Sequence, residues 1–187
     1  MQEDIDLYLE SAEEDMQSAI AHMRKELLKI RTGKASPAIL DGIFVEYYGS
    51  PTPLKQVANV KVADARTLTI EPWERKLLAD IERAIFSANL GLTPQNDGKI
   101  IRINMPPLTE ERRRDLVKKS KGFGEKARIS IRQARQEAIK GIKDTVKEGY
   151  PEDAGKKAEA TVQDLTNGYN KKVEAVLEAK EKDIMTV

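Results

Sequence analysis

Several residue types are absent or scarce in this chain of 187 residues. There is no cysteine, which excludes disulfides, thiolate catalysis and cysteine-ligated metals. Aromatic residues make up only 5%, which is low for a catalytic globule and normal for a helical bundle. No apolar run approaches the roughly 18 residues that a membrane-spanning helix needs. The acidic N-terminal stretch does not resemble a signal peptide, so we expect a cytoplasmic protein with no membrane partner.

Catalytic signals are also scarce. His22 is the only histidine and has no serine or aspartate partner at a meaningful spacing, so we interpret it as a structural residue. Gly122 and Gly124 look like part of a glycine loop, but they fall within a helical pattern and follow no strand, unlike a phosphate cradle. The sequence therefore predicts a protein that is not an enzyme and that holds no metal or cofactor.

Charge is segregated along the chain, although the net charge is only +1. Residues 1–30 carry 8 acidic and 3 basic side chains, a net charge of −5. Residues 106–140 carry 11 Lys or Arg and 5 Asp or Glu, a net charge of +6. A uniformly solvated surface would mix the two signs, so this segregation suggests a polyanionic partner for one face.

Three segments have the periodicity of long amphipathic helices. Residues 3–30 contain no glycine or proline and would span roughly 40 Å at 1.5 Å per residue. A second helix should follow Thr109, which can cap it, and run to about Lys147, with Gly141 as a tolerated weak point. A third should span residues 152–184. The apolar positions of the first helix are separated by steps of four or three: Ile5, Leu9, Ala12, Met16, Ile20, Met23, Leu27 and Ile30.

The segment between the first two helices has a different pattern. Runs rich in β-branched and aromatic residues predict strands at 43–48, 57–62, 67–71 and 99–104, and Gly49–Pro53 predicts a turn. A helix is predicted over 74–87, with one apolar side formed by Leu77, Leu78, Ile81, Ile85 and Phe86. We interpret Trp73, Tyr47 and Tyr48 as packing residues of this unit, with a base-stacking platform as the alternative.

These elements predict an α+β fold. Residues 1–30 and 106–187 should form a long antiparallel three-helix bundle, and residues 31–105 an inserted small β/α/β domain. The chain crosses between the two near 31–37 and 104–107. Two short parallel linkers make a hinge with restricted directions of motion rather than a free tether.

One face of the second helix carries a row of cations that appear unpaired in the sequence. Seven positions separated by alternating steps of four and three form this cationic stripe: Arg114, Lys118, Lys121, Glu125, Arg128, Arg132 and Arg135. Solvated faces usually carry Glu–Lys pairs, whereas here only one acid interrupts, and arginine favours bidentate phosphate contacts. Nucleic-acid contact is therefore our interpretation. A solvated face and docking to an acidic protein remain open.

The opposite face of that helix is apolar and should belong to a core. Its residues are Leu116, Phe123, Ala127, Ile131, Ala134, Ala138 and Ile142. Arg132 and Arg135, on the stripe, should face solvent.

Several motifs, in order along essentially the whole chain, resemble those of ribosome recycling factors. The similarity starts at the segment IRTGKASP, which resembles the hinge signature of that family. Further similar segments are VEYYG at 45–49, ARTL at 65–68, LGL at 90–92, PLTEERR at 107–113, ARISIR at 127–132 and LT at 165–166. Several positions depart from the pattern of the family. Among them, Lys34 stands where an arginine is common, and Gln136 stands where a second arginine often follows Arg135.

The resemblance implies an L-shaped monomer of roughly tRNA size. It implies action after termination, when the factor binds the large subunit and elongation factor G, using GTP, drives the ribosomal subunits apart. By motif, ribosomal RNA would be bound through Arg31, Arg132 and Arg135, with Arg128 close by; Arg114, Lys118 and Lys121 are further candidates for contact or only for steering. The hinge residues implied are Arg31, Thr32, Gly33, Ser36, Pro37, Asn104, Met105, Pro106 and Pro107.

Overall fold

The chain forms two compact units in the computed structural model, which describes residues 1–186. Residues 1–30 and 110–186 form one unit, and residues 31–109 the other. Val187, which the predicted bundle segment 106–187 includes, lies outside the described residues.

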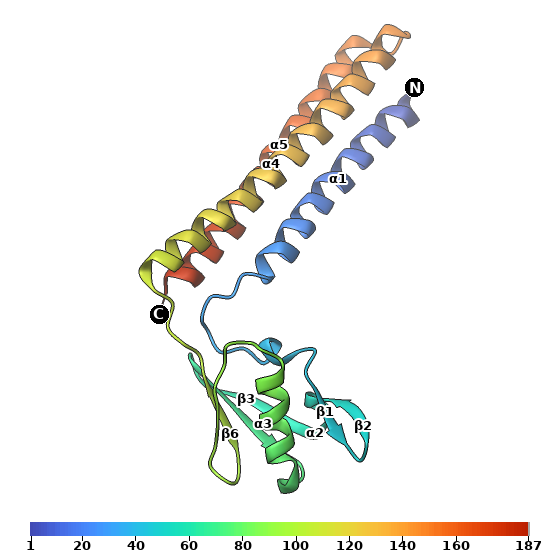
Figure 1. Ribbon diagram of the computed structural model, residues 1–187. Helices are drawn as coiled ribbons and strands as arrows, with labels where there is room; N and C mark the ends of the chain where they lie inside the picture. The colour runs from blue at the N-terminus through green and yellow to red at the C-terminus, as the bar shows by residue number, and fades with distance from the viewer. Residues whose placement is uncertain (187) are drawn as a thin grey trace. The chain divides into compact units, whose positions relative to one another are not determined.

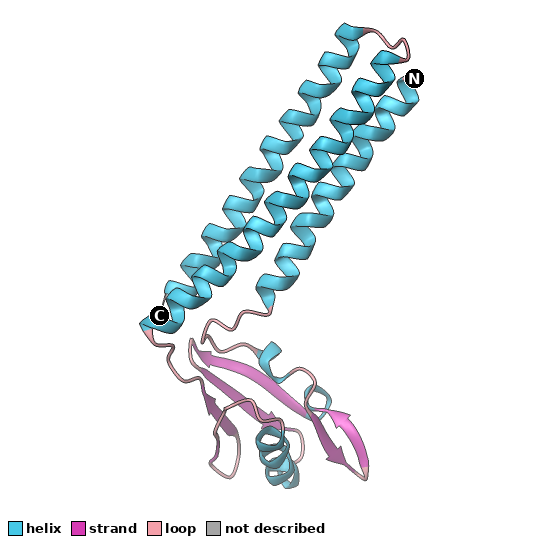
Figure 2. Ribbon diagram, turned by 45° about the horizontal axis from the view of Figure 1, so that its top comes forward, coloured by secondary structure: helices cyan, strands magenta, loops and turns pink. Residues whose placement is uncertain are grey.

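The first unit is a bundle of three long helices, α1 (Gln2–Leu28), α4 (Glu110–Lys147) and α5 (Glu152–Met185) (Figure 1). Helices α4 and α5 are antiparallel, and α1 begins at the end of the bundle where the turn between them lies (Figure 2). The hydroxyl of Tyr150, in this turn, donates to the Gln2 side-chain oxygen at 2.7 Å. The predicted long antiparallel bundle is confirmed.

The core of the bundle follows the predicted apolar positions closely. Leu9, Phe123, Leu165 and Val176 are only partly buried. The fully buried positions include three hydroxyl residues, whose hydroxyls donate to the carbonyl four residues earlier and so leave no unsatisfied donor in the core. These residues are Ser120, Thr145 and Thr166.

Two glycines of α4 mark close approaches within the bundle. A Cβ atom on Gly141 would lie 2.7 Å from the ring of Tyr8, and one on Gly124 would overlap the side chain of Leu177. Helix α4 runs through Gly141 without a break, as expected for a tolerated weak point, and the Tyr8 ring occupies the space that a side chain there would take. A glycine is required there because the α1 tyrosine ring packs directly against the α4 backbone.

The second unit is built on a four-stranded antiparallel sheet in the order β3-β4-β6-β5. The strands are β3 (Ala58–Asp64), β4 (Thr67–Pro72), β5 (Pro94–Asn96) and β6 (Ile101–Asn104). Helix α3 (Leu78–Ser87) lies over one face of this sheet (Figure 1). Its buried side meets the inward-facing residues of β4 and β6, which are Leu68, Ile70, Ile101 and Ile103.

A hairpin and three short helical turns complete this unit. The hairpin pairs β1 (Phe44–Tyr47) with β2 (Ser50–Pro53). The turns are η1 (Pro37–Leu40), α2 (Leu54–Val57) and η2 (Arg75–Leu77).

Three local predictions for this unit are wrong. Gly49–Pro53 does not form a turn as a whole, because a two-residue turn at Tyr48 and Gly49, with φ of +49° and +80°, frees the rest to pair as a strand. Phe86 is 56% exposed, since Ile85 already occupies the inward position of that helical turn. Trp73 is 68% exposed and does not pack into the core. Tyr47 is half-buried, and Tyr48, although 74% exposed, packs edge-on against Tyr47 with 4.5 Å between the ring centroids, so the prediction for these two tyrosines is not wrong.

Candidate nucleic-acid interface

The cationic stripe of α4 lies along the line where α4 meets α5. One hollow of about 330 Å³ on this line is lined by Arg114, Lys118 and Lys121 together with Glu181 and Met185 of α5. A second, of about 300 Å³, is lined by Arg128, Arg132 and Arg135 together with Gln163, Thr166 and Asn170 of α5; we call it the arginine groove. The spacing of the stripe therefore does gather its cations on one face, as predicted.

The positive surface continues beyond the stripe. A third hollow, of about 390 Å³, is lined by α4 residues that include Arg135, Lys140, Lys143 and Lys147. The spacing of the stripe does not predict these lysines, because the position four residues after Arg135 is Ile139, an apolar residue. Lys147 forms an ion pair with Asp144 at 2.9 Å, so the other cations supply the remaining positive charge of this hollow.

The N-terminal part of the stripe is not a row of unpaired charge. Arg114 forms an exposed ion pair with Glu110 one helical turn earlier, so the expectation of an unpaired cation at position 114 is wrong. Lys118 and Lys121 are exposed, and within residues 1–186 neither has an ion-pair partner. Exposed pairs contribute little to stability, so the main effect of Glu110 is to cancel local positive charge.

The arginine groove is held in place by α5. Arg128 is 34% exposed and lies 3.7 Å from the Glu125 carboxylate and 4.0 Å from that of Glu174, so the expectation of an unpaired cation is wrong here too. Arg135 is half-buried, and its Nε donates to the side-chain oxygen of Gln163 at 2.9 Å. The expectation that Arg135 simply faces solvent is therefore wrong.

This arrangement suits contacts to phosphate. The Nε bond to Gln163 orients the Arg135 guanidinium and leaves its two terminal nitrogens available. Arg132 is exposed and, in the part of the chain that the structure describes, has no hydrogen-bond or ion-pair partner. The three arginines span about 10 Å of helix, a distance that suits successive phosphates of a folded nucleic acid.

Arg31, the remaining candidate cation, lies outside the bundle at the first residue of the small unit, where it is exposed. Gly33 nearby has φ of +75°, a conformation that favours glycine. A Cβ atom on Gly33 would lie 3.1 Å from Leu108 Cγ, so the two segments that lead to the bundle contact each other.

Both of these segments are also bonded to the same sheet turn. The backbone N–H of Ala35 donates to the Ala65 carbonyl at 2.8 Å, and that of Met105 donates to the Arg66 carbonyl at 2.7 Å. Met105 is buried in the core of the small unit. The chain is therefore fixed to the small unit from residue 35 onward and up to residue 105.

The other implied hinge residues fall into two groups: some are bonded within the small unit, and the rest lie outside every helix and strand. Asn104 is the last residue of β6, paired with Thr67, and Ser36 accepts a bond from the Ala38 N–H at the start of η1, whose first residue is Pro37. Thr32, Gly33, Pro106 and Pro107 lie outside every helix and strand.

A cluster of tyrosine and charged side chains connects the β1–β2 hairpin to η2. The Glu74 carboxylate accepts from the Tyr47 hydroxyl at 2.7 Å and lies 2.9 Å from the Lys76 ammonium. These two contacts, the tyrosine first, lower the pKa of Glu74 below its usual 4.5. The Tyr48 hydroxyl accepts a hydrogen bond from the Lys76 ammonium at 2.6 Å. This bond, together with the contact to Glu74, raises the pKa of Lys76. Every member has a partner inside the unit, which indicates a structural cluster.

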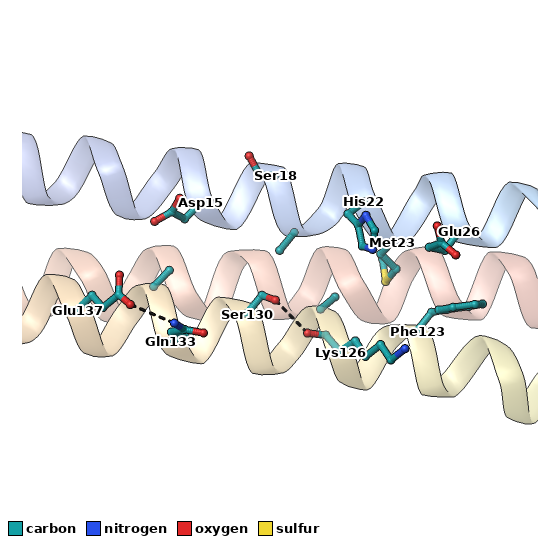
Figure 3. Close-up of a pocket in the computed structure, with 13 residues that line it drawn as sticks. Asp15, Ser18, His22, Met23, Glu26, Phe123, Lys126, Ser130, Gln133 and Glu137 are labelled. Atoms are coloured by element: carbon teal, nitrogen blue, oxygen red, sulfur yellow. Dashed lines mark hydrogen bonds between the residues drawn. The ribbon is translucent and has the colours of Figure 1, made fainter.

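Another hollow of the bundle, of about 580 Å³, lies between α1 and α4 (Figure 3). His22 is exposed in its wall. The polar groups of its α4 side bond within their own helix: Gln133 donates to Glu137 at 3.2 Å, and Ser130 to the Lys126 carbonyl at 3.2 Å. Across residues 1–186, no three His, Asp or Glu side chains gather closely enough to hold a metal ion. No helix within that range is suited to crossing a bilayer.

Comparison with known proteins identifies the family to which the chain belongs. A sequence model described as ribosome recycling factor matches residues 23–185. The chain belongs to the ribosome recycling factor family. The resemblance of its motifs is confirmed, and with it a place in protein biosynthesis.

Relatives in this family match the chain over its whole length. The ribosome-recycling factor of Flavobacterium johnsoniae is 55% identical over 187 residues, which covers 100% of both chains. That of Cytophaga hutchinsonii is 55% identical over 185 residues, 99% of this chain and 100% of the relative.

Solved structures of the family share the fold. A solution structure of the ribosome recycling factor is 38% identical, with a TM-score of 0.74 and 98% of each chain covered. The Thermus thermophilus recycling factor, described with Escherichia coli elongation factor G bound to the E. coli post-termination complex, is 39% identical with a TM-score of 0.61, covering 97% of this chain and 99% of that one. The predicted combination of a helical bundle and a small mixed domain is confirmed.

Proposed function

We propose that this member of the family binds the large ribosomal subunit after termination and, with elongation factor G and GTP, separates the ribosome into its subunits. The proposal rests on family membership together with one observation, the arginine groove. Three guanidinium groups within two helical turns, two of them positioned by α5, form a surface that complements the phosphates of ribosomal RNA.

The role is mechanical, and the chain catalyses no reaction. The helical unit supplies the anchor and the small unit receives force from the GTPase. The linkers support this division: the chain is bonded to the small unit at Ala35 and Met105, so rotation is confined to residues 31–34 and 106–109. Arg31 lies within that short segment, where we propose that it contacts RNA beside the pivot.

The exposed aromatic residues of the small unit support contact with a protein. Phe44, Tyr48, Trp73 and Phe86 are each more than half exposed. Aromatic side chains are enriched at protein–protein interfaces, where they supply contact area at a small cost in conformational entropy. They are candidates for contacting elongation factor G.

A subunit-splitting assay tests this function. Post-termination ribosomes are mixed with elongation factor G and GTP, with and without the protein, and light scattering follows separation. We expect splitting only with all components, and loss of splitting when Arg128, Arg132 and Arg135 are all replaced by alanine. Unchanged splitting by the triple variant would refute a role for the arginine groove.

Docking of the cationic stripe to an acidic protein is the competing explanation, and it makes a different prediction. Association through RNA should be abolished by nuclease treatment of the ribosomal subunits. Association through an acidic protein would survive that treatment.

A further inference from the structure

Helices α4 and α5 contain several glycines, and packing inside the bundle accounts for only some of them. At three positions an added Cβ atom would overlap a side chain of a neighbouring helix, so close packing requires glycine there. These positions are Gly124, Gly141 and Gly155. At the other two, Gly122 and Gly168, a Cβ atom would meet no atom within 4 Å.

The local backbone does not call for glycine at position 122 either. Gly122 lies well inside α4, which runs over Glu110–Lys147, and it is not among the residues with positive φ. Glycine destabilises the interior of a helix relative to alanine, because the unfolded chain has more conformations to lose. Within the part of the chain that the structure describes, no contact offsets this loss of stability.

Gly122 lies on the outermost line of α4, opposite the core of the bundle. At about 100° per residue, the buried Ile131 falls on the other side of the helix from Gly122. Ile129, two turns after Gly122, lies on the same outer line and is 51% exposed. The backbone at Gly122 is therefore open to a ligand that approaches from solvent.

Lysines lie on both sides of this open backbone. Lys118 and Lys121 belong to the cationic stripe on one side of the outer line, and Lys119 lies on the other side. All three are exposed, and none has an ion-pair partner within residues 1–186. Glu125 is the one acid within a turn of Gly122, and its carboxylate lies 3.7 Å from an arginine of the groove, which offsets its charge.

This combination indicates close contact with a phosphate backbone. A missing side chain lets another molecule approach the helix backbone directly, and exposed lysines attract phosphates. A protein helix could also approach closely at a glycine, but it would then need acidic residues opposite each of the lysines. A nucleic-acid strand carries a negative charge in every nucleotide, so it fits this surface without further conditions.

We propose that an RNA strand crosses α4 at Gly122, where its sugar–phosphate backbone contacts the helix backbone and its phosphates bind Lys118, Lys119 and Lys121. Gly122 does not line the arginine groove, so this contact extends RNA binding to the outer side of α4. Lys118 and Lys121 are then contact residues and do more than steer the approach. This inference rests on the proposed RNA-binding function.

The test compares two substitutions that add the same methyl group. Gly122→Ala places it in the proposed contact. Gly168→Ala places it at the other open glycine, on α5, where Asp164 and Lys172 lie one turn to either side. Affinity for purified large ribosomal subunits is measured by sedimentation of the full-length protein at several salt concentrations, with thermal unfolding in parallel. Both variants should fold, and their melting temperatures should rise by up to about 4 °C, because alanine is the better helix former.

We expect Gly122→Ala to bind large subunits at least about fivefold more weakly than the wild type, although it is the more stable protein. This is the effect of forcing a methyl group into a packed contact. The salt dependence should also become shallower, because the methyl group holds the phosphates away from the lysines. Gly122→Leu, with a larger side chain, should bind more weakly still. Gly168→Ala should bind as the wild type does.

Three results would overturn the assignment. Unchanged affinity in Gly122→Ala would mean that nothing approaches this backbone. Equal losses in the two alanine variants would mean that stiffer helices, and not a blocked contact, weaken binding. A loss in Gly122→Ala with the wild-type salt dependence would place a protein surface there instead of phosphates. Failure of the proposed function would look different, because the wild-type protein would then not bind large subunits at all.

Discussion

Arg135 provides the sharpest test of how the groove works. Its Nε is bonded to Gln163 at 2.9 Å, so its charge is oriented before any ligand arrives. Arg114 is on the same stripe, but its charge is offset by Glu110. The two arginines have the same charge, and only Arg135 is held in place by the neighbouring helix.

The expected loss on Arg135→Ala follows from these contacts. A hydrogen bond to a charged group contributes about 1.5–3 kcal/mol, so affinity for large ribosomal subunits should fall by roughly tenfold to 150-fold. The free protein loses one partly buried bond to Gln163, so its free energy of unfolding should fall by only about 1 kcal/mol. Arg135→Lys, which keeps the charge without the planar fork, should lie between the wild type and the alanine variant.

The assay is sedimentation of the protein with purified large subunits over a range of concentrations, with thermal unfolding measured in parallel. Arg114→Ala is the matched control and should change the affinity by less than about twofold, in keeping with a weak exposed ion pair. Equal losses for Arg114→Ala and Arg135→Ala would refute the reasoning, because the groove would then be only one part of a uniform basic surface.

Three further predictions concern the scaffold. Gly141→Ala should destabilise the protein by about 1–3 kcal/mol through overlap with Tyr8, whereas Gly168→Ala, where the added methyl group meets no atom within 4 Å, should stabilise it by up to about 1 kcal/mol; urea unfolding measures both. Gly33→Val should slow subunit splitting more than it weakens large-subunit binding, because a valine is strained at this positive φ; equal losses would count against a pivot there. Since the pKa of Glu74 is lowered in the folded protein, its contribution to stability is complete above about pH 4.5 and is lost as the pH falls through the lowered value, so Glu74→Gln should flatten the unfolding profile in that acidic range.

The helical unit could be predicted from the sequence because its signal is long and periodic. Over residues 3–30 the steps of four or three give eight apolar positions, and Leu9 is the only one of these eight that is not fully buried. The same spacing gathered the cations of α4 on one face, as the hollows along α5 show.

The small unit was harder to predict because its elements are short. Strand β5 has three residues, too few for an alternating pattern. Strand β2 contains two prolines, which usually indicate a turn, and it forms because the two-residue turn before it aligns it with β1. The exposure of Trp73 has no local signal, since an aromatic residue after a strand is compatible with either a core or a surface position.

The contribution of α5 to the groove could not be predicted from the sequence for a different reason. Gln163 and Asn170 are ordinary polar residues of a helix, and their importance depends on which residues of α4 lie opposite them. That register follows from packing over the whole bundle, including the contact of Gly124 with Leu177. A single helical pattern carries no information about it.

The salt dependence of binding to large ribosomal subunits tests the central claim most directly, namely that the arginine groove grips RNA phosphates. The dissociation constant is measured from low to moderate salt for the wild-type protein and for the variant with alanine at 128, 132 and 135. We predict a steep loss of affinity with salt for the wild type, and a logarithmic slope shallower by roughly 2–3 for the triple variant, close to one unit for each phosphate contact removed. A wild-type affinity that does not change with salt, or a triple variant with the wild-type slope, would contradict the account.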